Sequence, residues 1–225
     1  MPKVQVNETF PVFDFSTAYE DDLNSKDVLK GKTVFWFLRY IGCTVCRYDV
    51  HLLQQRYDEF VNKGAQVFVV MQSDRQHVRK DLESTDTRLP FSIICDPEQK
   101  IYQLLEIVPA ESMEALKAGV EEQLKEKGGK ARELGFVHGD YEGNEQQLPA
   151  LFIVNEDGTV AYAHYAKNIM DMPKIDEVLS TADGKTEELA DKITEILRSI
   201  LNPFIEAKSR GSGLKQLLSK KNTEE

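Results

Sequence analysis

One short run of residues constrains the fold of this chain more than any other feature. Residues 33–38, Thr-Val-Phe-Trp-Phe-Leu, are almost all apolar and are rich in β-branched and aromatic side chains. A strand of this length without a polar side is buried on both faces, as in the middle of a sheet covered by helices. The run therefore predicts an α/β fold built around residues 33–38.

The segments that follow extend this pattern along the chain. The expected elements are, in order, a helix over 50–61, a strand over 66–71, a helix over 75–84, a strand over 91–95, a helix over 98–105, strands over 151–154 and 160–165, and a helix over 174–179. Strands that alternate with helices through short connections form right-handed crossovers on a parallel sheet. The turn Asn155-Glu156-Asp157-Gly158 predicts a hairpin, which adds an antiparallel pair. We therefore expect a central mixed sheet flanked by helices.

Residues 108–146 interrupt the alternation of strands and helices. The spacing of Met113, Leu116, Val120 and Leu124 predicts one amphipathic helix that ends at Gly128-Gly129, followed by a loop rich in Gly and Asp. The segment has too few apolar residues for a core of its own, so we interpret it as a helix-loop insertion. The predicted organisation is one domain over residues 1–182, followed by a C-terminal extension over 183–225. That extension combines an amphipathic helix, near 186–201, with a flexible tail.

Composition and charge exclude several classes of partner. The chain carries 28 basic and 38 acidic residues, a formal charge of −10. We therefore predict no nucleic-acid partner and no anionic membrane surface, because basic residues are not in excess. No run approaches the roughly 20 apolar residues of a membrane span, and the N-terminus lacks the pattern of a signal peptide. Three cysteines do not form a disulfide framework. We expect a cytoplasmic protein.

Two of the three cysteines mark the candidate site. Cys43 and Cys46 follow the buried strand directly and lie at the beginning of a predicted helix. Unpaired backbone N–H groups and the helix dipole stabilise a thiolate at that place, so its pKa falls below the ordinary value. Arg39 and Arg47 bracket the pair and are expected to lower the pKa further; Thr44 lies between the sulfurs. A dithiol with this spacing can cycle to a disulfide.

Two alternatives compete with redox chemistry. A Cys-x-x-Cys pair also occurs in structural zinc sites, but these need a second pair of ligands, and Cys95 and the four histidines are scattered along the chain. The other alternative is a pair of buried structural cysteines. We favour redox chemistry and predict neither a metal nor a cofactor. Cys95 is interpreted as a buried structural thiol rather than a distant resolving cysteine.

Pro149 stands at the head of the strand over 151–154. A proline there is ordinary at the edge of a sheet. Beside a Cys-x-x-Cys pair on the same sheet we expect it to be a cis-proline, which would expose the preceding backbone groups to an extended substrate chain. Tyr40, next to the cysteines, is equally compatible with lining a substrate groove and with packing.

Several segments together resemble a known family. They are residues 10–15, 29–37, 39–47, 67–73, 94–97 and 148–158. They are similar to peroxiredoxins of the alkyl hydroperoxide reductase/thiol-specific antioxidant (AhpC/TSA) family, and the Cys43 turn resembles its peroxiredoxin-like branch. The resemblance spans roughly residues 4–180. It implies a thioredoxin-like fold, a disulfide or peroxide substrate, a reductant such as thioredoxin or a low-molecular-weight thiol, and the possibility of a homodimer.

The resemblance leaves the attacking cysteine open. Peroxiredoxins carry Thr or Ser three residues before the peroxidatic cysteine, which points to Cys46 with Cys43 in the place of the hydroxyl. In thioredoxins the first cysteine attacks, which points to Cys43. The family's arginine before the strand over 151–154 is absent, because Gln147 precedes Leu148 and Pro149, and Arg39 is a candidate to replace its charge. The family's proline upstream of the peroxidatic cysteine is also missing.

These departures favour disulfide exchange over peroxidase activity. The predicted function is a thiol-dependent oxidoreductase that uses Cys43 and Cys46 to reduce disulfides or hydroperoxides. One alternative is a peroxiredoxin-type peroxidase that attacks with Cys46. An alternative of another class is a non-catalytic redox-sensing or partner-binding module, which would use the insertion and the C-terminal helix as its contact surface.

Overall fold

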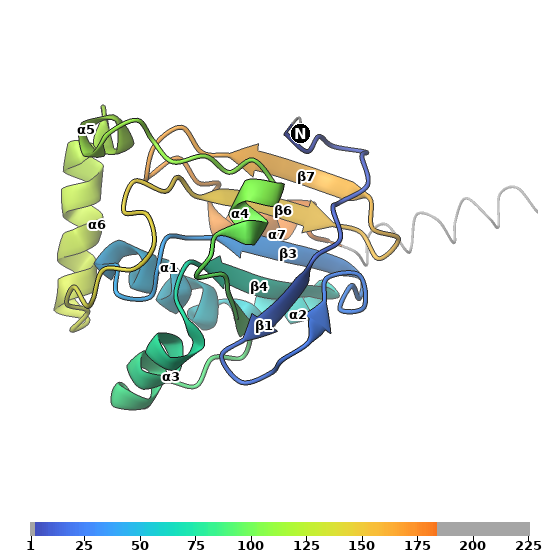
Figure 1. Cartoon of the computed structure of the whole chain (residues 1–225), viewed down its shortest axis with the longest axis horizontal. Coiled ribbons are helices and arrows are strands. Elements are labelled where there is room, and N and C mark those ends of the chain that lie inside the picture. The colour runs from blue at the N-terminus through green and yellow to red at the C-terminus, as the bar shows by residue number, and fades with distance from the viewer. Residues whose placement is uncertain (1–2, 184–225) are drawn as a thin grey trace, which may run out of the picture. The chain divides into compact units, whose positions relative to one another are not determined.

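The structure is a computed structural model that describes residues 3–183, and its centre is a mixed β-sheet (Figure 1). The strands are β1 (Asp14–Thr17), β2 (Leu23–Asn24), β3 (Lys32–Phe37), β4 (Ala65–Met71), β5 (Ser92–Cys95), β6 (Ala150–Val154) and β7 (Val160–Tyr165). Their order across the sheet is β2-β1-β5-β4-β3-β6-β7. Strand β3 is buried along its whole length, as its sequence predicts.

Strand directions confirm the expected mixed sheet. Strands β3, β4 and β5 are parallel, with Phe35 opposite Phe68 and Val70 opposite Ile94. Strand β6 pairs antiparallel with β3, and the hairpin predicted at residues 155–158 joins β6 to β7. The β1 strand closes the other side, antiparallel to β5. The segment 38–43 therefore leaves the carboxyl end of the central strand, where it is flanked by strands on both sides.

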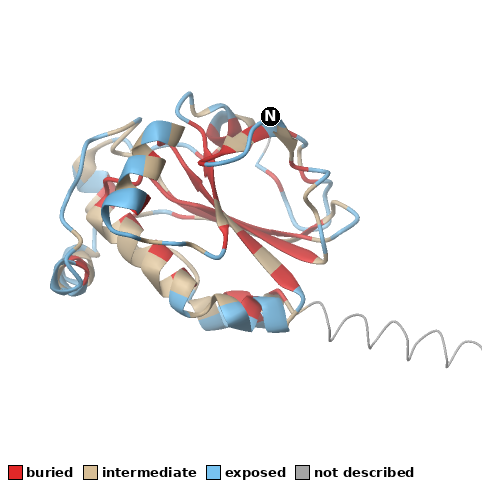
Figure 2. Ribbon diagram, turned by 90° about the horizontal axis from the view of Figure 1, so that it is seen from below, coloured by how far each residue is buried: buried red, intermediate tan, exposed pale blue. Residues whose placement is uncertain are grey.

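The sheet buries a different apolar cluster on each face. The helices are α1 (Thr44–Gln55), α2 (Tyr57–Asn62), α3 (Arg75–Ser84), α4 (Lys100–Leu104), α5 (Met113–Lys117), α6 (Glu121–Glu133) and α7 (Ile175–Thr181). Residues of α1, α2, α3 and α7 share one cluster with the sheet. The N-terminal segment and α4 cover the other face through a group of aromatic rings that includes Phe10, Phe13 and Phe35. Figure 2 shows the buried strands between these two layers.

The helix after the cysteines begins as expected but is interrupted. Helix α1 ends at Gln55, and α2 begins at Tyr57. Between them Arg56 adopts φ −116° and ψ 11°, which is not helical. The interruption changes the direction of the chain so that Phe60 of α2 is fully buried in the cluster beneath α1. The helix predicted over 75–84 has the bounds of α3.

The prediction of one helix ending at Gly128-Gly129 is wrong. The insertion contains two helices, α5 and α6, and both glycines lie inside α6. The chain breaks instead at Gly119, whose φ of +74° few other residues adopt. Helix α6 packs against α1, and Gly128 is buried in it. In Figure 1, α6 lies beside α1 at the end of the sheet where the cysteine segment emerges.

The C-terminal extension stays a prediction. The helix expected near 186–201 and the tail beyond it lie outside the described residues. Among residues 3–183, no helix is both long and apolar enough to cross a membrane.

Candidate active site

Cys43 caps the N-terminus of α1. Its backbone is extended, with φ −75° and ψ 116°, and α1 begins at the next residue, Thr44. The Cys43 sulfur accepts a hydrogen bond of 3.4 Å from the backbone N–H of Cys46. A helix N-terminus offers unpaired N–H groups and a partial positive charge, both of which favour a thiolate. The predicted placement of the two cysteines after the buried strand and at the beginning of a helix is confirmed, because Cys43 caps α1 and Cys46 lies in its first turn.

Arg39 provides the positive charge next to Cys43. Its Nη2 donates to the Cys43 Sγ at 2.9 Å, and its Nη1 donates to the backbone carbonyl of Glu145 at 2.6 Å. The side chain is buried, and its Nε–H has no partner among the described residues. The charge is therefore fixed against one sulfur, with one donor still unused. The Glu145 carbonyl belongs to the insertion, so the insertion helps to orient Arg39.

The two sulfurs differ in acidity. Burial opposes ionisation of Cys43, but the hydrogen bond from the Cys46 thiol, the Arg39 charge and the Cys46 backbone N–H together lower the pKa of Cys43 to about 6. Burial raises the pKa of Cys46, and its hydrogen bond to the Cys43 sulfur raises it further. Near neutral pH, Cys43 is therefore the thiolate and Cys46 the thiol that donates to it.

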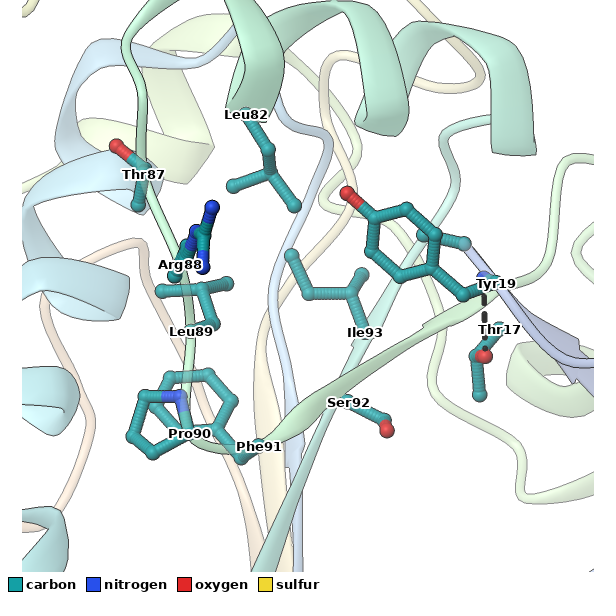
Figure 3. A pocket seen from close by; sticks show the side chains of 11 residues that line it. Thr17, Tyr19, Leu82, Thr87, Arg88, Leu89, Pro90, Phe91, Ser92 and Ile93 are labelled. Carbon is teal, nitrogen blue, oxygen red and sulfur yellow. Dashed lines mark hydrogen bonds between the residues drawn. The ribbon is translucent and has the colours of Figure 1, made fainter.

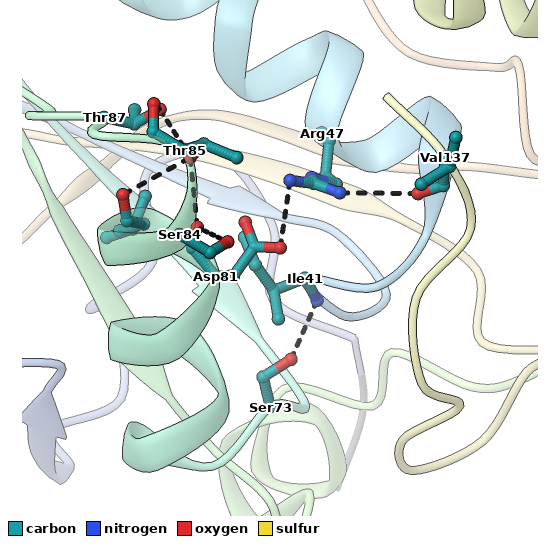
Figure 4. Close-up of polar contacts among 9 residues, drawn as sticks. Ile41, Arg47, Ser73, Asp81, Ser84, Thr85, Thr87 and Val137 are labelled. Carbon is teal, nitrogen blue, oxygen red and sulfur yellow. Dashed lines mark hydrogen bonds and ion pairs between the residues drawn. The ribbon is translucent and has the colours of Figure 1, made fainter. Parts of the chain in front are cut away.

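Arg47, which the sequence placed beside the sulfurs, makes its hydrogen bonds and its ion pair elsewhere. Its guanidinium pairs with Asp81 of α3 at 2.9 Å and donates to the carbonyl of Val137 at 3.3 Å (Figure 4). It also lies 5.3 Å from the centre of the Phe136 ring. The reason is its position on α1, where Asp81 and the insertion offer partners on the side away from Cys43. Arg47 thus ties the insertion to α1 and α3.

A cavity of about 240 Å³ gives access to Cys43. Thr44 lines it, as do Arg39, Tyr40 and residues of α5, α6 and the insertion loop. Cys43 itself is only 1 % exposed. A space of this volume is enough for a small molecule.

Pro149 lies beside Cys46 rather than Cys43. It lines a small enclosed cavity together with Cys46 and Asp49. The expectation of a cis-proline is wrong, because no peptide bond among residues 3–183 is cis. The Pro149 carbonyl accepts from the N–H of Ala166, so the backbone here is engaged by the connection after β7. Gln147, near the place of the family's arginine, donates instead to the carbonyl of Ile107 at 2.8 Å.

The insertion loop crosses the cysteine segment at very close range. The N–H of Gly139 donates to the carbonyl of Gly42 at 2.8 Å. A Cβ on Gly42 would lie 2.2 Å from the carbonyl oxygen of Asp140, so only glycine fits there. Glu142 adds a second attachment, since it accepts from the Ser73 hydroxyl at 2.7 Å while Ser73 accepts from the N–H of Ile41 at 2.8 Å.

Sequence reasoning missed a buried ion pair behind Cys46. Lys127 of α6 pairs with Asp49 of α1 at 2.7 Å, and the two side chains are 16 % and 19 % exposed. Asp49 is one of the charges that raise the pKa of Cys46. Neither residue lies in a recognisable motif, and only the packing of α6 on α1 brings them together.

Other clusters in the described residues lie apart from the cysteine pair. Asp74, His77 and Glu142 are close enough to hold a metal ion, and neither Cys43 nor Cys46 belongs to that group. Burial raises the pKa of Cys95 to about 12, as expected for a structural thiol. A cavity of about 410 Å³ between α3 and β5 is lined by residues such as Tyr19, Arg88 and Phe91 and contains no cysteine (Figure 3).

Comparisons with known proteins agree with this architecture. Residues 6–163 match the model of the AhpC/TSA family. Over 121 residues the chain is 32 % identical to peroxiredoxin 2 of Sulfuracidifex metallicus; the match covers 52 % of this chain and 53 % of that protein. The chain thus spans about half the length of this relative.

Solved structures of peroxiredoxins share the fold at low identity. A mutant of peroxiredoxin 6 of Arenicola marina matches with a TM-score of 0.57 and 14 % identity over 80 % of this chain and 72 % of that one. A yeast mitochondrial 1-Cys peroxiredoxin gives a TM-score of 0.58 and 16 % identity over 84 % and 78 % of the two chains. Peroxidoxin BcpB of Mycobacterium tuberculosis gives 0.54 and 11 % over 79 % and 95 %.

These structures confirm the thioredoxin-like fold predicted from the sequence. The family match covers most of the described residues, including Cys43, which caps α1, and the sheet that positions it. The chain belongs to the AhpC/TSA family.

Proposed function

We propose that the protein is a thiol peroxidase in which Cys43 attacks a hydroperoxide and Cys46 resolves the product. The observation that carries the proposal is the contact of 2.9 Å between Arg39 Nη2 and the Cys43 sulfur at the N-terminus of α1. A thiolate is the reactive form of cysteine, and a fixed cation and a helix N-terminus both increase its population.

The reaction balances with the groups at this site. The Cys43 thiolate attacks the terminal oxygen of ROOH, the O–O bond breaks, and Cys43 becomes a sulfenic acid while RO⁻ takes up a proton and leaves as ROH. The Cys46 thiol then attacks the sulfenic sulfur, releasing water and forming the Cys43–Cys46 disulfide. Two electrons and two protons from an external thiol, either thioredoxin or a low-molecular-weight thiol, restore the dithiol.

Access favours a hydroperoxide over a protein disulfide. Cys43 is 1 % exposed beneath the insertion, within a cavity of about 240 Å³. The Nε–H of Arg39, unpartnered within residues 3–183, is a further donor beside this thiolate, suited to a peroxide oxygen. A protein disulfide would need a wider opening, so direct exchange with proteins requires the insertion to move.

We expect the insertion to move when an external thiol reduces the Cys43–Cys46 disulfide. The yeast mitochondrial 1-Cys peroxiredoxin has a thiol resolving mechanism that proceeds via the glutathione and thioredoxin systems. By analogy we propose a reductant of one of these two kinds for this chain. A homodimer remains a prediction of the family resemblance.

Trapping the first oxidation product tests the proposal. The Cys46→Ser variant is mixed with one equivalent of hydroperoxide and then with a reagent that labels sulfenic acid, and the labelled peptide is identified by mass spectrometry. In Cys46→Ser we expect the label on Cys43, and in Cys43→Ser we expect no label. Cys95→Ser is the control and should behave like the wild-type protein. A label on Cys46 in Cys43→Ser would establish the alternative in which Cys46 attacks. Absence of oxidation in every variant would overturn the proposal, and oxidation without turnover by any reductant would favour the non-catalytic redox-sensing or partner-binding module.

A further inference from the structure

Several residues within 3–183 line the cavity together with Arg39 and Cys43. Among them, Tyr40 is the only one that both carries a side-chain hydroxyl and is fully buried. Tyr40 is 0 % exposed, and its ring lies 5.4 Å from the centre of the Arg39 guanidinium. The Cys43 N–H donates to the Tyr40 carbonyl, so the two residues form one turn. Tyr40 also stands three residues before Cys43.

The partner of the Tyr40 hydroxyl comes from the insertion. It is His138, whose Nε2 lies 3.2 Å from the hydroxyl oxygen. The other ring nitrogen, Nδ1, lies 2.8 Å from the carbonyl oxygen of Gly139. A carbonyl only accepts, so Nδ1 carries the hydrogen, and in the neutral ring Nε2 accepts from Tyr40. His138 itself is exposed. An exposed ring therefore holds the buried hydroxyl in place.

Peroxide reduction at this site needs a proton donor. The leaving oxygen departs as alkoxide or hydroxide, a base far stronger than a thiolate or a carboxylate, so it needs a proton as it leaves. Arg39 cannot lose a proton in the physiological range. The Cys46 thiol donates to the Cys43 sulfur and is needed afterwards to resolve it. Burial raises the pKa of Tyr40, which keeps its hydroxyl protonated until a strong base forms next to it.

We propose that Tyr40 is the general acid for the leaving oxygen and that His138 is the positioning residue that returns the proton from solvent. This inference rests on the proposed function. As the O–O bond breaks, the Tyr40 hydroxyl turns from Nε2 of His138 to the leaving oxygen, its O–H bond breaks, and its proton passes to RO⁻, giving ROH. Nε2 of His138 then takes up a proton from water, which makes the ring an imidazolium, and passes that proton to the phenolate, which restores the neutral ring and the Tyr40 O–H bond. General acid catalysis of this kind contributes about 10²- to 10⁴-fold.

Leaving groups that need no proton provide the test. A peroxycarboxylic acid releases a carboxylate, whose conjugate acid has a pKa of about 4 to 5, whereas an alkyl hydroperoxide releases an alkoxide. We would measure the rate of Cys43 oxidation by tert-butyl hydroperoxide and by peracetic acid in wild type and Tyr40→Phe. We expect a loss of about 100-fold with the alkyl hydroperoxide and less than about threefold with the peracid.

Matched variants separate proton transfer from packing. Tyr48→Phe makes the same chemical change on α1, at a residue that does not line the cavity, and is expected to leave both rates unchanged. His138→Phe changes an exposed residue and tests the relay independently if Tyr40→Phe fails to fold. We expect it to slow the alkyl hydroperoxide about 10-fold, because the Tyr40 hydroxyl loses the partner that positions it, and to spare the peracid.

The possible outcomes distinguish this inference from the proposed function. Equal losses with both oxidants in Tyr40→Phe, or in His138→Phe when the first variant does not fold, would overturn the general acid while leaving peroxidase activity intact. A wild-type protein whose Cys43 reacts with neither oxidant would overturn the proposed function and the general acid together.

Discussion

Arg39 donates from Nη2 to the Cys43 sulfur at 2.9 Å, and the same guanidinium donates from Nη1 to the Glu145 carbonyl of the insertion. One side chain thus connects the reactive sulfur with the segment that covers it. The rest of the site follows from this connection, because the insertion both restricts access to Cys43 and fixes the charge that ionises it.

Removing the Arg39 charge should make Cys43 less acidic. In Arg39→Met the thiolate loses its nearest cation, so its pKa should rise by about 1 to 3 units. Arg47→Met is the control, because the Arg47 guanidinium faces Asp81 and Val137 instead. The pH dependence of Cys43 alkylation by iodoacetamide measures the pKa of Cys43 in both variants. Equal midpoints in Arg39→Met and wild type would show that the arginine does not set the ionisation.

Gly42→Ala should loosen the insertion over Cys43. The added Cβ would lie 2.2 Å from the Asp140 carbonyl oxygen, so the loop has to shift. We expect a loss of about 1–3 kcal/mol in the free energy of unfolding. We also expect faster labelling of Cys43 by a bulky thiol reagent. Chemical denaturation measures the first effect and mass spectrometry the second.

Gly129→Ala, a change within the insertion, should have the opposite effect on stability to Gly42→Ala. Gly129 lies inside α6, and nothing lies within 4 Å of a Cβ built there. Alanine should stabilise the protein by about 0.5–1 kcal/mol through helix propensity, with no change in the labelling of Cys43. Faster labelling in Gly129→Ala would mean that access does not depend on the contact at Gly42.

The Lys127–Asp49 pair should matter more than a surface pair on the same helix. Lys127→Met leaves the Asp49 carboxylate, which is 19 % exposed, without its partner. We expect a loss of about 3–5 kcal/mol in unfolding free energy. Lys130→Met removes an exposed pair with Glu126 and should cost less than about 0.5 kcal/mol. Similar values for the two variants in urea denaturation would contradict the importance of burial.

Local sequence patterns were sufficient to predict strands β3 to β7, whereas β1 and β2 were not among the expected strands. The apolar run of β3 and the turn at 155–158 are short-range signals, and both predictions are confirmed. The insertion was harder, because Gly128 and Gly129 carry the signal of a helix end. Packing of α6 on α1 overrides that signal, and Gly119, with φ +74°, supplies the break.

The candidate site also contains features that the local sequence predicted and features that only the tertiary packing creates. The sequence predicted Cys43 at the beginning of the helix that follows β3, and this is where it caps α1. Arg39 and Arg47 flank the cysteines on either side in sequence, yet only Arg39 reaches the sulfur, because α1 turns Arg47 toward Asp81. His138 lies 98 residues from Tyr40, and no local pattern joins them. Only the path of the insertion brings the two together.

The most direct test of the account is the pH dependence of cysteine alkylation in the reduced wild-type protein, with Cys43 and Cys46 followed separately by peptide mass spectrometry. A thiolate reacts and a thiol does not, so the rate at Cys43 should rise with pH through a midpoint of about 6 and reach a plateau above it. Cys46 should stay unreactive across that range, because its pKa is raised. A Cys43 midpoint at the value of an ordinary thiol, or earlier reaction of Cys46, would contradict the account.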